Sequence, residues 1–372
     1  MIASTKPVVV YGASGYTGML IMEQLIDLGI PFIAAGRDAK KIRENMAARV
    51  AGIENGDFEV VQVEHETEKL ARLFSGARVV CNTVGPFLKY FREVAQACLE
   101  ADCHYLDTTG EQASTIAIEG EYGNAFRQKQ LVLAPAVSYM FVPLHIAAEL
   151  CVEQGGIDTL ECVSIPTIMP TVGSANSIMM VLLETAYFLK DGKYVEWRLG
   201  DSREVVTPGF ASTNLGLPWG GTQLPQFYKG HPHVRNCIGL VGFPNRDLMV
   251  GLIEQAKKMK QQVEGKSQAE RYAVMDSFAR GLSASMPPRE KTSVNRSIDH
   301  AVARGPLKEV SATLIGVNPY IVTAAVQAYA ASRLLAESNH GVGFTSACAA
   351  FGHREILGFL ESRGLMSHRI SA

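Results

Sequence analysis

The stretch that decides the fold lies near the start of the chain and reads Val8-Val9-Val10-Tyr11-Gly12-Ala13-Ser14-Gly15-Tyr16-Thr17-Gly18. Its continuous apolar run is typical of a strand that is buried on both faces of a parallel sheet. The glycines follow with G-x-x-G-x-x-G spacing, and a segment of helical periodicity begins at Tyr16. A strand, a glycine turn and a helix in this order predict a loop that cradles a pyrophosphate.

The three glycines have distinct predicted roles. Gly12 permits the tight turn, Gly15 lets the backbone approach a pyrophosphate, and Gly18 lets the helix pack closely on the strand. The free N–H groups at the start of the helix then attract the anion. A glycine turn without a ligand is the alternative, but the strand and the helix around it favour a dinucleotide. The residues predicted to bind the cofactor here are Gly12, Ser14, Gly15, Tyr16, Thr17 and Gly18.

The end of the second predicted strand indicates which dinucleotide binds. An NAD site usually has Asp or Glu there, to accept hydrogen bonds from the ribose 2′-hydroxyl. Here the strand ends in Ala34-Ala35-Gly36-Arg37-Asp38, and the planar fork of Arg37 suits a 2′-phosphate. Asp38 is predicted to cap the helix that follows. We therefore predict NADP(H) rather than NAD(H), with Arg37 and Lys41 in the site.

Short apolar runs alternate with segments of helical periodicity through the first part of the chain. The predicted strands are Val8–Tyr11, Phe32–Ala35, Phe58–Val63, Arg78–Asn82, His104–Leu106 and Leu131–Ala134. The predicted helices are Tyr16–Leu28, Thr67–Phe74, Phe91–Ala101 and Ile116–Lys129. Because this alternation is typical of successive right-handed crossovers, we predict an α/β fold, with a Rossmann-type doubly wound parallel sheet over residues 1–150.

The regular alternation of strands and helices ends after about residue 155. This change predicts a second, α+β domain for substrate binding and dimerisation over residues 151–315. Its predicted strands are Thr159–Thr167, Tyr194–Val206 and Leu307–Ile315, and its predicted helices are Ser177–Leu189, Arg246–Val263 and Ser267–Leu282. The region from Thr207 to Asn245, rich in Gly, Pro and aromatic residues, predicts a lid or binding loop. Residues 316–372, with predicted helices at Tyr320–Glu337 and about Arg354–Gly364, are expected to pack back on the first domain.

Composition and charge exclude several classes of protein. A net charge of −2 and a sequence pI of about 6.5 argue against nucleic-acid binding, which needs a basic excess. The most apolar late stretch, Gln130 to Cys151, is broken by two prolines and a histidine, so we expect no membrane span. The seven cysteines are scattered, and Cys81 and Cys98 lie in apolar segments. We expect buried, reduced thiols in a cytoplasmic protein and no metal site.

Three further motifs begin at the fourth predicted strand. They are Cys81-Asn82-Thr83-Val84-Gly85-Pro86-Phe87, Val94-Ala95-Gln96-Ala97-Cys98 and His104-Tyr105-Leu106-Asp107-Thr108-Thr109-Gly110-Glu111. With the glycine turn and Gly36-Arg37, they closely resemble the saccharopine dehydrogenase-like superfamily over about residues 7–145. A fainter similarity to the trans-acting enoyl reductases of that group continues in Thr171–Ser177, Gly316–Tyr320 and Gly341–Gly343.

The resemblance implies that the turn after the fourth strand carries the nicotinamide side of the cofactor, through Thr83, Val84, Gly85 and Pro86. Phe87 and Ser174 become candidate substrate contacts, the latter in the predicted second domain. The family also implies a homodimer that forms through the sheet of that domain. For Asp107, Thr109 and Glu111 both a catalytic and a supporting role fit, and we favour support.

The chain departs from the family after the sixth predicted strand. The family commonly carries G-F-D-S-x-P-x-D there, whereas this chain has Ser138-Tyr139-Met140-Phe141-Val142-Pro143-Leu144-His145. Met140 and His145 replace both acids, and Tyr139 replaces the phenylalanine. The site has therefore gained a phenol and an imidazole, which argues against the chemistry of saccharopine, a basic amino-acid substrate that meets carboxylates.

Hydride chemistry at a nicotinamide needs one proton source or sink from the protein. Tyr139 is the first candidate, because a tyrosine at the tip of the sixth strand can reach over the nicotinamide and contact the substrate. His145 is the second candidate, with a helix residue held by a neighbour as the alternative. His231 and His233 are further candidates, but with the proline between them they are also suited to shaping a loop.

The second predicted domain is rich in apolar and aromatic side chains without a basic cluster for an anionic substrate. They include Met169, Met179, Met180, Phe210, Trp219, Phe227 and Tyr228. Methionines at such spacing are more often core than pocket. If they line a pocket, with Trp219 as a substrate contact, a hydrophobic substrate with an activated C=C, C=O or C=N bond fits best.

Three hypotheses follow. The first is an NADP(H)-dependent oxidoreductase that reduces an activated C=C bond of a hydrophobic small molecule. The second is an imine reductase or amino-acid dehydrogenase that acts on a C–N bond. The third is a protein that binds NADP(H) without turnover and uses its occupancy to regulate an interaction.

Overall fold

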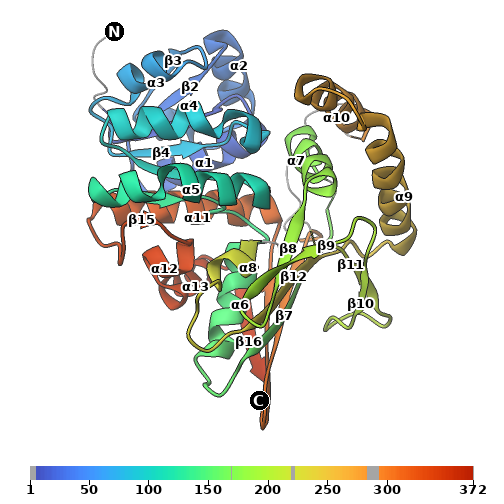
Figure 1. The fold of residues 1–372 in the computed structure, drawn as a ribbon. Helices are drawn as coiled ribbons and strands as arrows, with labels where there is room; N and C mark the ends of the chain where they lie inside the picture. The colour runs from blue at the N-terminus through green and yellow to red at the C-terminus, as the bar shows by residue number, and fades with distance from the viewer. Residues whose placement is uncertain (1–5, 169, 219–222, 283–292, 372) are drawn as a thin grey trace. The chain divides into compact units, whose positions relative to one another are not determined.

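The fold was analysed in a computed structural model that describes residues 6–168, 170–218, 223–282 and 293–371. The chain forms two compact units. The first contains the residues up to Thr109, Ser114–Tyr139 and Tyr320–Ser362. The second contains Gly110–Ala113, Met140–Pro319 and the residues from Arg363 onward. Figure 1 labels the helices and strands of both units.

The first unit is built on a parallel sheet of seven strands in the order β15-β6-β5-β4-β1-β2-β3 (Figure 1). The strands are β1 (Val8–Tyr11), β2 (Phe32–Gly36), β3 (Phe58–Gln62), β4 (Val79–Asn82), β5 (His104–Asp107), β6 (Val132–Ala134) and β15 (Gly343–Phe344). The chain starts at the middle of the sheet, runs outward to β3, and then crosses back to β4 on the other side of β1. This order confirms the predicted Rossmann-type doubly wound fold.

Helices cover both faces of this sheet, which explains why its central strands β1 and β2 are continuously apolar. The helices are α1 (Tyr16–Asp27), α2 (Ala39–Arg49), α3 (Thr67–Phe74), α4 (Phe87–Glu100), α5 (Gln112–Gln128), α11 (Pro319–Leu335), α12 (Ala347–Phe351) and α13 (His353–Ser362), with the short turn η1 (Ile53–Asn55). On one face, Val9 and Tyr11 pack with Phe74, Phe91 and Phe126 of α3, α4 and α5. On the other face, the alternate residues of β1 are equally buried.

The second unit is built on a mixed sheet in the order β16-β14-β13-β7-β12-β8-β9, in which only β7 and β12 run parallel among the described strands. These strands are β7 (Thr159–Pro166), β8 (Ala186–Lys190), β9 (Lys193–Trp197), β12 (Asn236–Val241), β13 (Ser297–Gly305), β14 (Lys308–Gly316) and β16 (Met366–Ser371). A separate antiparallel pair consists of β10 (Arg203–Val205) and β11 (Asn214–Gly216). A mixed sheet with helices confirms the predicted α+β class of this part of the chain.

Small residues on the second sheet let a helix pack closely on it. The helices of this unit are α6 (Val142–Val152), α7 (Val172–Leu183), α8 (Gln223–Phe227), α9 (Arg246–Val263) and α10 (Gln268–Leu282). Helix α6 lies on β13 and β14, where Ala301 and Ala303 are completely buried. The Cys151 thiol of α6 approaches the carbonyl of Ala301 at 3.8 Å. The helices α7, α9 and α10 contact one another.

Two elements of the second unit differ from the sequence prediction. The helix predicted over Ser177–Leu189 is α7, which ends at Leu183 because Glu184 adopts an extended conformation. The chain then continues as strand β8, which pairs with β9. The strand predicted over Tyr194–Val206 is divided into β9 and β10, because Gly200 turns the chain with a φ of +87°.

The boundaries between the units also differ from the predicted domains. Helix α6 belongs to the second unit, so the chain changes unit after Tyr139 rather than at residue 150. Residues 320–362 belong with the first sheet, as expected for the C-terminal segment. The last strand β16 pairs with β14 and returns to the second unit.

None of the described helices has both the length and the hydropathy required to cross a bilayer. All seven cysteines are buried and form no disulfide.

Candidate functional site

The glycine turn after β1 leaves no room for a side chain at its first glycine. The N–H groups of Gly12 and Ala13 both donate to the carbonyl of Ala35, at 3.0 and 3.1 Å. Gly12 has a φ of +95°, and a Cβ atom there would lie 2.4 Å from the Thr83 hydroxyl oxygen. The turn is therefore pressed against β2 and the loop after β4, and its geometry requires glycine at this position.

Helix α1 begins at this turn with an N-terminus suited to an anion. Gly15 is its N-cap residue, no side chain caps the helix, and the first turn contains no acidic residue. The amide of Asn45 on α2 donates to the Ser14 carbonyl at 2.9 Å and holds the turn in place. Asn45 was not predicted as a site residue, because nothing in the sequence pairs it with a loop thirty residues earlier. The helix N-terminus attracts negative charge through its dipole and its N–H groups.

Tyr16 is a predicted cofactor residue of this turn, but its side chain packs against another helix. Its ring is 8% exposed and meets Tyr320 of α11 edge-on, with the ring centroids 5.3 Å apart. Tyr16 therefore contributes its backbone to the turn, and its ring packs inside the first unit.

Positive charge is available where β2 ends. Arg37 and Lys41 are both exposed, and no ion pair is formed by either among the residues that the structure describes. The carboxylate of Asp38 accepts the N–H of Lys41 at 2.9 Å and caps α2, as predicted. Asp38 is thus engaged as a helix cap, which leaves Arg37 as the charged group presented to a ribose phosphate.

The loop after β4 approaches the same edge of the sheet. The Thr83 hydroxyl donates to the Tyr11 carbonyl at 3.0 Å, and the Val84 N–H donates to Asn82 at 3.0 Å. Gly85 is exposed, and its peptide bond to Pro86 is cis. These hydrogen bonds therefore fix the backbone of the predicted nicotinamide turn, while Gly85 stays exposed to solvent.

Phe87, predicted as a substrate contact, is buried under this turn instead. Its side chain is 5% exposed, and its ring lies 3.3 Å from the position of a Cβ atom on Gly85. The structure gives the Phe87 ring a supporting role in the turn.

Asp107 at the end of β5 fastens the neighbouring loops. Its carboxylate is completely buried and accepts hydrogen bonds from the Tyr105 hydroxyl at 2.7 Å, the Thr109 N–H at 2.9 Å and the Ala136 N–H at 2.8 Å. Burial raises the pKa of Asp107 to about 6, while these hydrogen bonds act in the opposite direction. The favoured supporting role of Asp107 is what this geometry shows.

Helix α11, almost two hundred residues later in the chain, holds the loop that carries Tyr139. The amide of Gln327 donates to the carbonyls of Asp107 and Val137 at 2.8 and 2.9 Å. The Thr323 hydroxyl accepts the N–H of Tyr139 at 2.9 Å. Helix α11 was predicted as a helix, but this role was not, because the partners are distant in sequence.

The two proton-transfer candidates lie in different units. Tyr139 closes the loop after β6 in the first unit, and its side chain is 6% exposed. His145 lies in α6 of the second unit, stacked on Phe227 with ring centroids 5.3 Å apart. Its Nε2 atom is 3.2 Å from Glu149, which also accepts a hydrogen bond from the Tyr228 hydroxyl at 2.6 Å. The imidazole thus lies on a helix and is held by its neighbours.

The other candidates have similarly local partners. The N–H of Ser174 donates to Thr171, the N-cap residue of α7, at 3.2 Å. Glu111 accepts the Ser177 hydroxyl at 2.8 Å. The N–H of His233 donates to the His231 ring at 3.2 Å, so this pair shapes its own loop. Met169 and Trp219 lie outside the described residues.

Cys81 and Cys98 are fully buried, and burial raises the pKa of the Cys81 thiol to about 12 and that of the Cys98 thiol well above its usual range. At neutral pH both remain thiols, so neither is an activated nucleophile.

These features together fit a phosphorylated dinucleotide. The turn has no room for a Cβ atom at Gly12, the start of α1 attracts an anion, and Arg37 is exposed at the end of β2. Residues 8–137 match the saccharopine dehydrogenase NADP binding domain. The predicted resemblance is confirmed, and the cofactor of this domain is NADP(H). Residues 144–372 match a family of unknown function (DUF5938), and the chain belongs to this family.

Curated relatives match the chain over part of their length. A lipid droplet localized protein of Caenorhabditis elegans is 29% identical over 38% of this chain and 35% of its own length. A probable mitochondrial saccharopine dehydrogenase-like oxidoreductase of Arabidopsis thaliana is 24% identical over 37% of this chain and 33% of its own length. A trans-acting enoyl reductase of Mycobacterium tuberculosis is 31% identical over 28% of this chain and 25% of its own length. The matched segments thus span about a third or less of these relatives.

Proposed function

We propose that the chain is an NADP(H)-dependent oxidoreductase that reduces an activated C=C bond of a hydrophobic small molecule. The observation that supports it most directly is the exposed Arg37 beside the open N-terminus of α1, with Asp38 already engaged as a helix cap. Bound NADP(H) supplies or accepts a hydride at its nicotinamide ring. The turn from Thr83 to Pro86 would hold that ring, because hydrogen bonds to Tyr11 and Asn82 fix the backbone of the turn.

Tyr139 is the proton donor in this proposal. Its N–H is fixed by Thr323, and the carbonyl of Val137 two residues earlier is fixed by Gln327. A donor on a loop held at two points keeps its position between turnovers, as proton transfer requires. His145 is the weaker candidate, since its ring is packed on Phe227 and its Nε2 atom faces Glu149.

The choice of an apolar substrate follows from the altered segment after β6. Tyr139, Met140 and His145 stand where the resembling family places a phenylalanine and two acids, so the carboxylates for a basic amino acid are absent there. The relatives named as enoyl reductases favour a C=C bond, and the relative named for lipid droplets favours an apolar substrate. Chemistry on a C–N bond, or binding without turnover, is the rival. NADPH consumption with a medium-chain α,β-unsaturated ketone but not with saccharopine would support the proposal, and the reverse would overturn it.

Replacing Arg37 by alanine is expected to weaken NADPH binding by about 10- to 100-fold, since a charge-assisted hydrogen bond contributes roughly 1.5–3 kcal/mol. NADH, which has no 2′-phosphate, should bind the variant within about twofold of the wild type. Titration calorimetry with both dinucleotides measures the two effects. Arg43→Ala is the matched control, because Arg43 is exposed on α2. Equal losses for NADPH and NADH would contradict a 2′-phosphate contact.

Replacing Tyr139 by phenylalanine is expected to lower the rate of substrate reduction by about 100-fold, the scale of a lost general acid. NADPH binding should stay unchanged, because the backbone contact of Tyr139 with Thr323 is kept. Steady-state rates and calorimetry on the same preparations separate these effects. Tyr122→Phe, which removes another hydroxyl of the first unit, is the control. A Tyr139→Phe enzyme with the wild-type rate would exclude the phenol as donor.

A further inference from the structure

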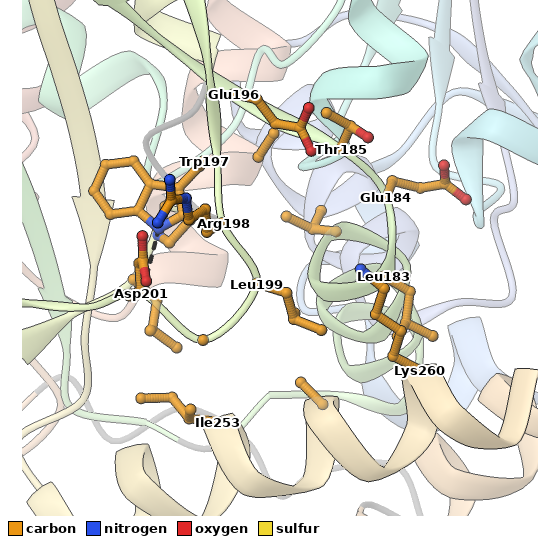
Figure 2. Close-up of a pocket in the computed structure, with 16 residues that line it drawn as sticks. Leu183, Glu184, Thr185, Glu196, Trp197, Arg198, Leu199, Asp201, Ile253 and Lys260 are labelled. Atoms are coloured by element: carbon orange, nitrogen blue, oxygen red, sulfur yellow. Dashed lines mark hydrogen bonds between the residues drawn. The ribbon is translucent and has the colours of Figure 1, made fainter. Parts of the chain in front are cut away.

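The second unit contains a cavity that no step of the proposed reaction uses. It lies among the end of α7, the start of β8, the end of β9 with the turn after it, and helix α9 (Figure 2). Its empty volume is about 620 Å³, counted with the part that is open to solvent.

The floor of the cavity is apolar. Ala186, Trp197, Leu217 and Ala256 line it and are 7%, 9%, 2% and 1% exposed. The indole N–H of Trp197 donates to the carbonyl of Asp201 at 3.1 Å, so the polar atom of the ring is already engaged. The floor therefore offers an apolar surface rather than hydrogen bonds, and it favours a ligand with an alkyl chain.

The cavity has a fixed frame. Gly200 turns the chain between β9 and β10, and a Cβ atom there would lie 2.4 Å from the Lys257 side chain of α9. The guanidinium of Arg203 lies 5.5 Å from the ring centroid of Trp197 and 3.8 Å from Glu161. The indole is thus held in place on the floor.

The mouth of the cavity is charged, and the charges are unevenly arranged. Figure 2 shows Lys260 rising from α9 beside Leu183, across the cavity from Arg198 and Asp201. Arg198 and Asp201 lie on one side of the cavity, and Glu196 lies on the strand above them in this view. Glu184 points away from the middle, and Arg271 pairs with it at 3.6 Å. Among the described residues Lys260 forms no ion pair, so its ammonium group is available to an anionic head group.

We propose that this cavity binds an amphiphile with an alkyl chain and an anionic head, such as a medium-chain fatty carboxylate. The alkyl chain of the ligand lies on the floor formed by Trp197, Leu217 and Ala256, and its carboxylate binds the ammonium group of Lys260. The inference is independent of the proposed reaction, because binding here requires neither NADP(H) nor turnover.

Titration of the full chain with dodecanoate, below its micelle concentration, tests the proposal by calorimetry and by tryptophan emission. We expect one saturable site and a change in emission, since Trp197 lies on the floor. Ile253→Trp, at a half-buried lining residue of α9, should fill the cavity and weaken binding by about 10-fold or more. Retained NADPH binding and an unchanged melting temperature show that this variant is folded.

Charge reversal tests the head group. Lys260→Glu should weaken dodecanoate binding by about 5- to 10-fold, while Lys258→Glu, on an exposed residue of the same helix outside the cavity, should leave it within about twofold. Because Lys260 is exposed, this variant keeps the proposal falsifiable even if Ile253→Trp does not fold. Dodecyltrimethylammonium should bind the wild type more weakly than dodecanoate does. The absence of saturable binding, dodecanoate binding that survives both variants, or equal affinity for the two amphiphiles would overturn the proposal.

Discussion

Replacing Asp107 by alanine is expected to lower the free energy of unfolding by about 3–5 kcal/mol, because it leaves buried donors without an acceptor. The carboxylate accepts three hydrogen bonds, from the Tyr105 hydroxyl and from the N–H groups of Thr109 and Ala136. Alanine cannot accept any of them, and water does not reach this position, which is fully buried. Urea unfolding at pH 7.5, where Asp107 is ionised in the wild type, measures the loss.

Two variants show whether the loss comes from these hydrogen bonds. Asp107→Asn keeps an oxygen for the two backbone N–H groups and should lose only about 1–2 kcal/mol. Asp57→Ala removes an exposed carboxylate that pairs with Lys6 at the surface, and should change stability by less than about 1 kcal/mol. If alanine at position 107 cost no more than at position 57, Asp107 would not be fastening the loops after β5 and β6.

The first half of the fold was predictable because β1, β2, β4, β5 and β6 are buried at every residue. Val8–Tyr11 is continuously apolar, and the glycine turn after it marks its end. The same reasoning located β2 to β6 within one or two residues. The short β15 gave no such signal, because Gly343 and Phe344 form a strand only through pairing with β6.

The second half was less predictable because its sheet is mixed and partly exposed. The apolar spacing of Ser177–Leu189 continues past the end of α7, and neither glycine nor proline marks the change to β8. What ends the helix is tertiary, because β8 pairs with β9 on one side and β12 on the other. Helix α6 was not predicted at all, since the apolar run around it lacks a polar face.

The residues of the candidate site also divide into those that could be predicted from the sequence and those that could not. Residues next to each other in the chain, such as Gly12 with Gly15 or Arg37 with Asp38, could be assigned from their spacing and chemistry. Asn45, Thr323 and Gln327 could not, because each acts through one hydrogen bond to a distant loop. The burial of Phe87 could not be predicted either, because its ring packs against the turn that precedes it. Its contact with the substrate stays a prediction.

A second buried aspartate gives the second unit a predictable dependence on pH. Asp299 on β13 is completely buried and accepts a hydrogen bond from the Ser164 hydroxyl on the paired strand β7. Its other carboxylate oxygen has no hydrogen-bond partner among the described residues. Burial raises the pKa of Asp299 to about 8, and the Ser164 hydrogen bond lowers it by less. At neutral pH the folded chain therefore keeps this carboxyl group protonated.

The sign of the effect follows from proton linkage. Below about pH 4 the carboxyl is protonated in both the folded and the unfolded chain, so its ionisation does not affect stability. Between about pH 4 and pH 8 the unfolded chain loses the proton and the folded chain keeps it. The free energy of unfolding then falls by up to about 1.4 kcal/mol per pH unit, and it levels off above pH 8.

Asp299→Asn removes this titration and keeps an oxygen that can accept the Ser164 hydroxyl. We expect the variant to match the wild type near pH 4 and to exceed its stability by a few kcal/mol at pH 8. Urea unfolding across this range measures the difference, in which the titration of all other groups cancels. Asp158→Asn, at a half-exposed aspartate of the same unit, is the matched substitution control. If the Asp299→Asn difference did not change with pH, the folded chain would be carrying an ionised Asp299, and a cation or ordered water would have to solvate its second oxygen inside the sheet.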